Sequence, residues 1–142
     1  SVSTAILDRR VRKFGERIVA DPAAQIPALA CELNLSVSWL QQLFKRQTGE
    51  SMASFIIRRR MLLAAHLLRT TELRVKEVSA RVGYRHPPSF DRLFSRVLGI
   101  APKDYRDLSA GLPPPRCRDF RMFRAPAPTL CALCLRCEGT GT

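Results

Sequence analysis

Two stretches of this chain repeat one pattern of apolar, small and turn-forming residues. Residues 26–55 read IPALACELNLSVSWLQQLFKRQTGESMASF, and residues 75–105 read VKEVSARVGYRHPPSFDRLFSRVLGIAPKDY. The turn residue Asn34 matches Gly83 at an offset of 49, whereas Gly49 matches Gly99 at an offset of 50. The second copy therefore holds one extra residue, within 84–90. The chain carries one short supersecondary unit twice.

Composition favours a folded domain with a strongly basic surface. The 142 residues are 46% hydrophobic, which is enough for a core. The formal charge is +12 at pH 7, and most of it lies before residue 110. This charge indicates a polyanionic partner, either nucleic acid or an anionic membrane surface. No apolar run approaches the roughly 20 residues of a membrane-spanning helix, and the start does not resemble a signal peptide. We expect no membrane partner and a cytoplasmic location.

The spacing of apolar residues predicts an all-α fold. Seven helices are expected, over residues 4–20, 27–33, 37–48, 52–68, 75–82, 87–98 and 102–108. Ser3 or Thr4 is the expected cap of the first, and Ser36 or Ser38 that of the third. No segment shows the period-two alternation of a strand. The helix over 52–68 would link the two copies of the repeat.

The composition changes after residue 109. Residues 110–142 hold five of the ten prolines and four of the five cysteines, without helical periodicity. We therefore divide the chain into a folded domain, 1–109, and a poorly ordered Pro-, Cys- and Arg-rich tail, 110–142. The cysteines of the tail that could ligate a metal are Cys117, Cys131, Cys134 and Cys137. Zinc sites usually use two separated C-x2-C pairs, so we expect no metal and no cofactor. The fifth cysteine, Cys31, is expected in the core.

Each repeat has the pattern of a helix-turn-helix, whose second helix enters the major groove of DNA. On the first such helix Leu40, Leu43 and Phe44 must point inward, so its polar residues point outward. Glutamine pairs with adenine, serine contacts several base edges, and arginine pairs with guanine. The expected base contacts are Ser38, Gln41, Gln42, Ser89 and Arg92. The expected contacts to the DNA backbone are Trp39, Lys45, Arg46, Ser95 and Arg96. For Trp39 two roles are equally expected, stacking on the DNA or covering the domain surface.

The chain resembles, over about residues 5–108, the AraC/XylS family of bacterial transcription regulators. The resemblance rests on residues 26–49, on R-M-x-x-A-x-x-L-L at 60–68, on V-K-E-V-S-x-x-V-G-Y at 75–84 and on F-x-R-x-F-x-x-x-x-G-x-x-P-x-x-Y-R at 90–106. It implies a seven-helix, homeodomain-like bundle with two helix-turn-helix units joined by a long linker helix. It also implies sequence-specific promoter binding at the bacterial nucleoid, and activation through contact with RNA polymerase. By the same resemblance the base readers map onto residues 38, 41 and 42, and onto 88, 89 and 92.

Most members of that family carry an N-terminal effector or dimerisation domain. The residues before the first repeat are too few for one, so we expect either a fragment of a longer regulator or a stand-alone member. Arg58, Arg59 and Arg60 point about 100° apart on a helix. They would form either a phosphate patch or a face that is solvated or salt-bridged.

Catalysis has little support in the chain. No nucleophile motif, glycine-rich phosphate loop or H-E-x-x-H pattern is present, so we expect no enzyme. Two alternatives to a sequence-specific regulator stay open. One is a metal- or redox-sensing module that uses the Cys-rich tail, and the other is a nucleic-acid binder without sequence preference.

Overall fold

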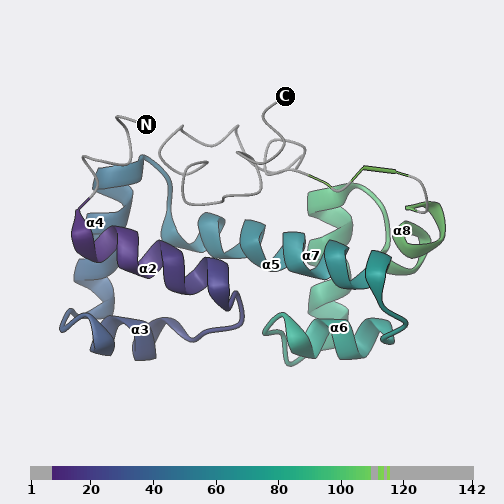
Figure 1. Ribbon diagram of the computed structural model, residues 1–142, viewed down its shortest axis with the longest axis horizontal. Helices are drawn as coiled ribbons and strands as arrows, with labels where there is room; N and C mark the ends of the chain where they lie inside the picture. The colour runs from purple at the N-terminus through teal and green to yellow at the C-terminus, as the bar shows by residue number, and fades with distance from the viewer. Residues whose placement is uncertain (1–7, 110–111, 114, 116–142) are drawn as a thin grey trace.

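The computed structural model describes residues 8–109, 112, 113 and 115 of the chain. Within them all regular structure is helical, as the sequence predicts, and no strand occurs (Figure 1). The helices are α2 (Arg9–Ala20), α3 (Ile26–Glu32), α4 (Val37–Thr48), α5 (Met52–Thr70), α6 (Val75–Arg81), α7 (Pro87–Leu98) and α8 (Pro102–Leu108). The prediction of a poorly ordered tail falls almost wholly outside the described residues.

The helix boundaries follow from local side-chain chemistry. Ser36 caps α4, because its Oγ accepts a hydrogen bond from the Trp39 N–H at 3.1 Å. Asp8 caps α2 by accepting from the Arg10 N–H, and the expected caps Ser3 and Thr4 lie outside the described residues. The linker helix α5 ends two residues later than expected. There the hydroxyls of Thr70 and Thr71 donate to the carbonyls of His66 and Leu67, one turn back, at 2.7 and 2.6 Å.

The duplication is visible in the two turns. Asn34 has φ +57° and Gly83 has φ +103°, the left-handed conformation that closes a helix. In both turns the next residue donates its N–H to the carbonyl five residues back, Leu35 to Ala30 at 3.0 Å and Tyr84 to Ser79 at 2.9 Å. Ala30 and Ser79 are buried, as the close crossing of the following helix requires. The turn comprises residues 33–36 in the first unit and 82–86 in the second. The extra residue of the second copy therefore lies in its turn.

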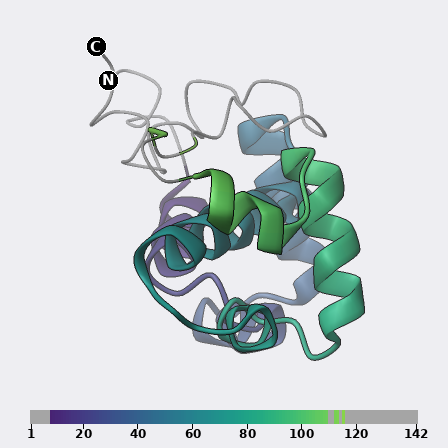
Figure 2. The same cartoon turned by 90° about the vertical axis from the view of Figure 1, so that its right-hand side faces the viewer.

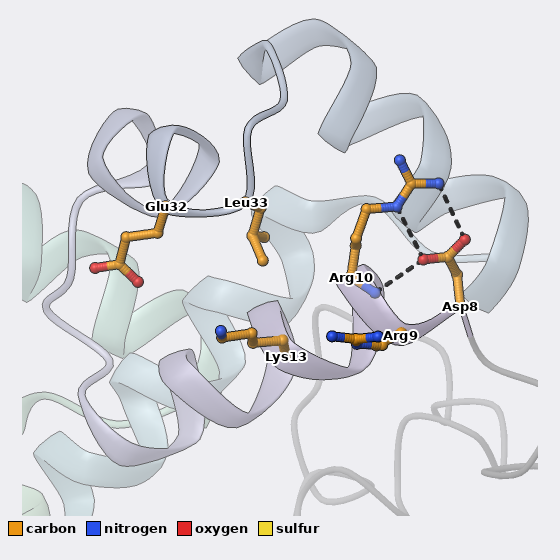
Figure 3. Close-up of a pocket in the computed structure, with 6 residues that line it drawn as sticks. All are labelled: Asp8, Arg9, Arg10, Lys13, Glu32 and Leu33. Atoms are coloured by element: carbon orange, nitrogen blue, oxygen red, sulfur yellow. Dashed lines mark hydrogen bonds and ion pairs between the residues drawn. The ribbon is translucent and has the colours of Figure 1, made fainter.

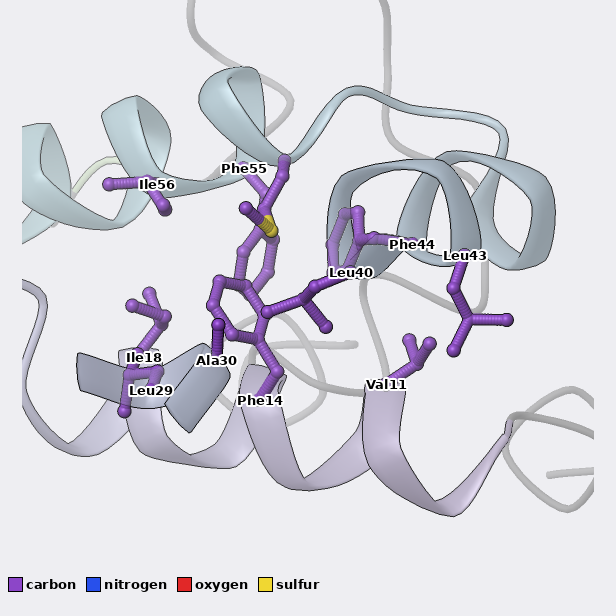
Figure 4. Close-up of a cluster of buried hydrophobic side chains, with 11 residues drawn as sticks. Val11, Phe14, Ile18, Leu29, Ala30, Leu40, Leu43, Phe44, Phe55 and Ile56 are labelled. Carbon is purple, nitrogen blue, oxygen red and sulfur yellow. The ribbon is translucent and has the colours of Figure 1, made fainter. Parts of the chain in front are cut away.

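Two separate hydrophobic cores lie along α5. The first, shown in Figure 4, takes side chains from α2, α3, α4 and the start of α5. The second takes side chains from the rest of α5 and from α6 and α7, with Tyr105 of α8 packed against it. Phe44 and Phe55 in the first core have ring centroids 5.3 Å apart, and the equivalent pair in the second core, Phe94 and Tyr105, lie 5.5 Å apart. The helix α8 therefore repeats the start of α5.

The helices α4 and α7 stand at the two ends of α5. Figure 1 shows them upright and roughly parallel, with α5 running between them. Figure 2 shows both toward one side of the molecule, while α2 lies toward the other side. With 19 residues at 1.5 Å per residue, α5 is about 28 Å long. One continuous helix thus holds the second helix of each unit on a common side.

Replacing Gly83 by alanine should cost more stability than replacing Gly49. Both glycines have positive φ, +103° and +79°, which costs an L-residue about 1–2 kcal/mol. An added Cβ at Gly49 meets nothing within 4 Å, whereas at Gly83 it would lie 3.0 Å from Arg60 Cζ and 3.2 Å from Ala23 Cα. Equilibrium urea unfolding of Gly83→Ala and Gly49→Ala measures the difference. Equal losses would mean that the close approach around Gly83 costs nothing.

Candidate nucleic-acid interface

The outward face of α4 is polar and basic. Leu40, Leu43 and Phe44 are buried at the i, i+3 and i+4 positions, as predicted. This leaves the opposite face of the helix in solvent. Ser38, Gln41, Gln42, Lys45 and Arg46 are all exposed, and Trp39 is 40% exposed. The structure brings together every residue predicted for the first unit on one helix face.

The outward face of α7 is the counterpart of that of α4, at an offset of 50. Ser89, Arg92 and Arg96 are exposed, and Ser95 is half-buried. Asp91 is exposed too, at the position that Gln41 holds in α4. The predicted contacts omitted Asp91, although the repeat offset places it in line with a predicted base reader. A carboxylate there can accept a hydrogen bond from the amino group of cytosine.

Trp39 and Arg46 form a pair on the surface of α4. The guanidinium carbon of Arg46 lies 5.7 Å from the centre of the Trp39 ring, in the range of a cation–π contact. The contact with the ring limits the positions of the Arg46 side chain, while the other polar residues of this face remain exposed to solvent. Trp39 thus partly covers the domain surface and remains exposed enough to meet a ligand.

A buried ion pair fixes the end of α4 to α5. Arg58 is only 2% exposed, and its guanidinium donates to both carboxylate oxygens of Glu50, with Nη2 to Oε2 at 2.6 Å. Thr48 donates its hydroxyl to the Phe44 carbonyl at 2.8 Å in the last turn of α4. A two-pronged contact of this kind is directional as well as strong. It holds the loop between α4 and α5 in one geometry.

The structure decides between the expectations for the arginines of α5: a salt-bridged side chain is confirmed at Arg58, whereas a phosphate patch or a solvated face is wrong for Arg58 and Arg59. Arg58 and Arg59 are 2% and 7% exposed, and Arg60 is half-buried with its Nε donating to the Pro22 carbonyl at 2.8 Å. Because both units pack on α5, this helix has little surface left for solvent. The salt bridge of Arg58 to Glu50 agrees with the salt-bridged alternative.

Two clefts flank the first unit. One of about 280 Å³ lies between the exposed face of α4 and the start of α5, and is lined by Gln41, Gln42, Lys45, Ser51, Met52 and Ala53. The other, of about 510 Å³, is lined by Asp8, Arg9, Arg10, Lys13, Glu32 and Leu33 (Figure 3). In the larger cleft the hydrogen bond from the Arg10 side chain lowers the pKa of Asp8. The smaller cleft adjoins the predicted base readers.

The structure corrects the expectation for Cys31. This residue is exposed, because Leu29 and Ala30 take the inward positions of the short helix α3. Within the described part of the chain, no three His, Cys, Asp or Glu side chains are grouped as a metal site. The candidate ligands Cys117, Cys131, Cys134 and Cys137 lie outside that part. Across residues 8–109, no helix has both the length and the apolar character for crossing a bilayer.

Comparisons with known proteins agree with this architecture. Residues 29–107 match the model of a family described as a helix-turn-helix domain. The transcriptional activator RhaR of Yersinia pestis is 39% identical over 67 residues, which are 47% of this chain and 23% of RhaR. The regulatory protein SoxS of Escherichia coli is 35% identical over 86 residues, 61% of this chain and 80% of SoxS. The chain thus matches under a quarter of the length of RhaR.

A solved structure adds the geometry. The DNA-binding domain of AdpA, a global transcriptional factor, has been solved in complex with a target DNA. It superposes with a TM-score of 0.60 at 27% identity, over 75% of this chain and 95% of that domain. The two helix pairs and the long connecting helix are therefore a known fold.

Replacing Glu50 by glutamine should destabilise the protein by about 2 kcal/mol or more, because the buried Arg58 loses its counter-charge. Glu32→Gln is the matched control. Glu32 pairs with Arg17 at 2.9 Å, but the two side chains are 46% and 53% exposed, so that loss should stay below about 1 kcal/mol. Urea unfolding compares the two variants. If both lose the same amount, burial does not strengthen the Arg58 pair.

Proposed function

The chain belongs to the AraC-type helix-turn-helix family, and we propose that it binds duplex DNA sequence-specifically through α4 and α7 to regulate transcription. One observation carries the proposal. The helices α4 and α7, whose polar positions are exposed and related by an offset of 50 in the sequence, lie on the same side of the molecule (Figure 2). A monomer with that arrangement can enter two neighbouring segments of a major groove.

The base readers in this proposal come from both faces. Ser38, Gln41 and Gln42 serve the first half-site, and Ser89 and Arg92 serve the second. All five are exposed. Glutamine pairs with adenine through two hydrogen bonds, and arginine with guanine in the same way. The two half-sites should therefore differ in base composition.

Backbone contacts position the protein in register. We assign these contacts to Trp39, Lys45, Arg46, Ser95 and Arg96, which lie beside the base readers on the same helices. Successive major-groove segments are about 34 Å apart, whereas α5 is about 28 Å long. We propose that the bound DNA bends to bring the two segments closer.

The wider role follows the relatives. RhaR is named a transcriptional activator, and we propose activation through contact with RNA polymerase in the bacterial cytoplasm, at the nucleoid. Most of RhaR lies outside the match, so an N-terminal effector or dimerisation domain remains a prediction of the resemblance. The binding test is selection of duplexes from a random library. If the affinity for the best selected duplex were about the same as that for random DNA, the protein would be a DNA binder without sequence preference.

Arg92→Ala and Arg46→Ala should have different kinds of effect on DNA binding. Arg92→Ala should lose about 1–3 kcal/mol of discrimination at one base pair, with little change at the others. Arg46→Ala should weaken binding to all sequences alike and reduce the salt slope by about one unit. Titrations of the selected duplex and of its single-base variants, at several salt concentrations, measure both effects. Identical profiles would contradict the assigned division between base and backbone contacts.

A further inference from the structure

One side chain in the middle of α5 joins the two units. Arg60 donates its Nε hydrogen to the carbonyl of Pro22 at 2.8 Å. Pro22 lies in the loop 21–25, which connects α2 to α3 in the first unit. This contact spans 38 residues of sequence. Arg60 therefore holds the loop that leads into the first helix-turn-helix.

The same guanidinium meets the turn of the second unit. Its carbon lies 5.1 Å from the centre of the Tyr84 ring, within the range of a cation–π contact. At the adjacent Gly83, an added Cβ would be 3.0 Å from Arg60 Cζ and 3.2 Å from Ala23 Cα. The loop of one unit and the turn of the other thus approach each other around one arginine. Only a residue without a side chain leaves room for this approach.

Both ends of this contact lead to a DNA-facing helix. The Tyr84 ring packs on Phe90 of α7 with 6.0 Å between centroids. The loop 21–25 continues into α3, which packs on α4. Burial raises the pKa of the Tyr84 hydroxyl, in keeping with a ring enclosed between the two units. Arg60 is therefore connected through packed residues to both α4 and α7.

We propose that Arg60 is a positioning residue that sets the orientation of the two helix-turn-helix units relative to each other, and so the half-site spacing that the protein accepts. The role of Arg60 in half-site spacing rests on the proposed function, whereas its role in orienting the two units does not. Each unit has its own core, so each should fold without the contact. If α5 were the only connection, the two units could still bend and twist relative to each other. A fixed orientation favours one spacing, since simultaneous engagement of two sites depends on matched geometry.

The first test uses the free protein and no DNA. Residual dipolar couplings of amides in the two units should fit one alignment tensor in the wild type. In Arg60→Lys, which keeps the charge but loses the planar fork, they should require two. Tyr84→Leu should behave like Arg60→Lys, whereas Tyr84→Phe, which keeps the ring face, should behave like the wild type. The control is Arg17→Lys, a change at an exposed arginine of α2.

The second test uses the best duplex selected with the wild type, together with derivatives that have one base pair inserted or removed between the half-sites. The wild type should lose about tenfold or more in affinity for each altered spacing, and Arg60→Lys less than about threefold. Affinity for a duplex with a single half-site should be the same in both proteins. This last measurement separates positioning from folding.

Three outcomes would overturn the proposal. The first is a single alignment tensor in both Arg60→Lys and Tyr84→Leu. The second is an unchanged spacing profile in Arg60→Lys, and the third is an equal loss on the single half-site, which would show that Arg60 supports the fold of one unit. If the wild type shows no sequence preference, the proposed function fails, and the dipolar couplings alone decide the role of Arg60.

Discussion

Burial of apolar side chains along the whole of α5 is the interaction on which the molecule depends. Phe55 and Ile56, near its start, belong to the first core, and Leu62 and Leu68, further along, belong to the second. Because one helix supplies side chains to both cores, each unit is held on α5 by apolar contacts of its own. This burial keeps α4 and α7 on a common side, where both helices can meet one duplex, and under our proposal Arg60 then sets the orientation of one unit relative to the other.

The arginines show how a basic chain divides its charge between folding and binding. Arg46 and Arg96, at equivalent positions of α4 and α7, stand in solvent. Arg58 is enclosed and paired with Glu50, since a buried guanidinium is tolerated only with a close counter-charge. Arg60 lies between these extremes, bonded to a carbonyl and stacked on a ring. Net charge therefore overstates the charge that faces DNA, because some arginines serve the architecture.

The two units have one design but different surfaces. Their left-handed turn residues Asn34 and Gly83, the glycines that end α4 and α7, and the ring pairs Phe44–Phe55 and Phe94–Tyr105 correspond, so the backbone of the second unit largely repeats the first. The exposed positions differ: Gln41 corresponds to Asp91, and Lys45 to the half-buried Ser95. The first unit thus offers more positive charge, and the second offers an acidic side chain among its base-facing residues. Under the proposed function, the two half-sites would be bound with unequal strength and different base preference.

Local chemistry in the chain was enough to predict the seven helices, their turns and the polar residues on α4 and α7. Positive-φ positions such as Asn34 and Gly99, and apolar spacing around Leu40, depend on neighbours within a few residues. Tertiary structure alone decided that Arg58 is buried, that Cys31 is exposed and that Arg60 reaches both Pro22 and Tyr84. Those outcomes depend on which segments pack against α5, and residues about 40 positions apart in the sequence carry no local sign that they will meet.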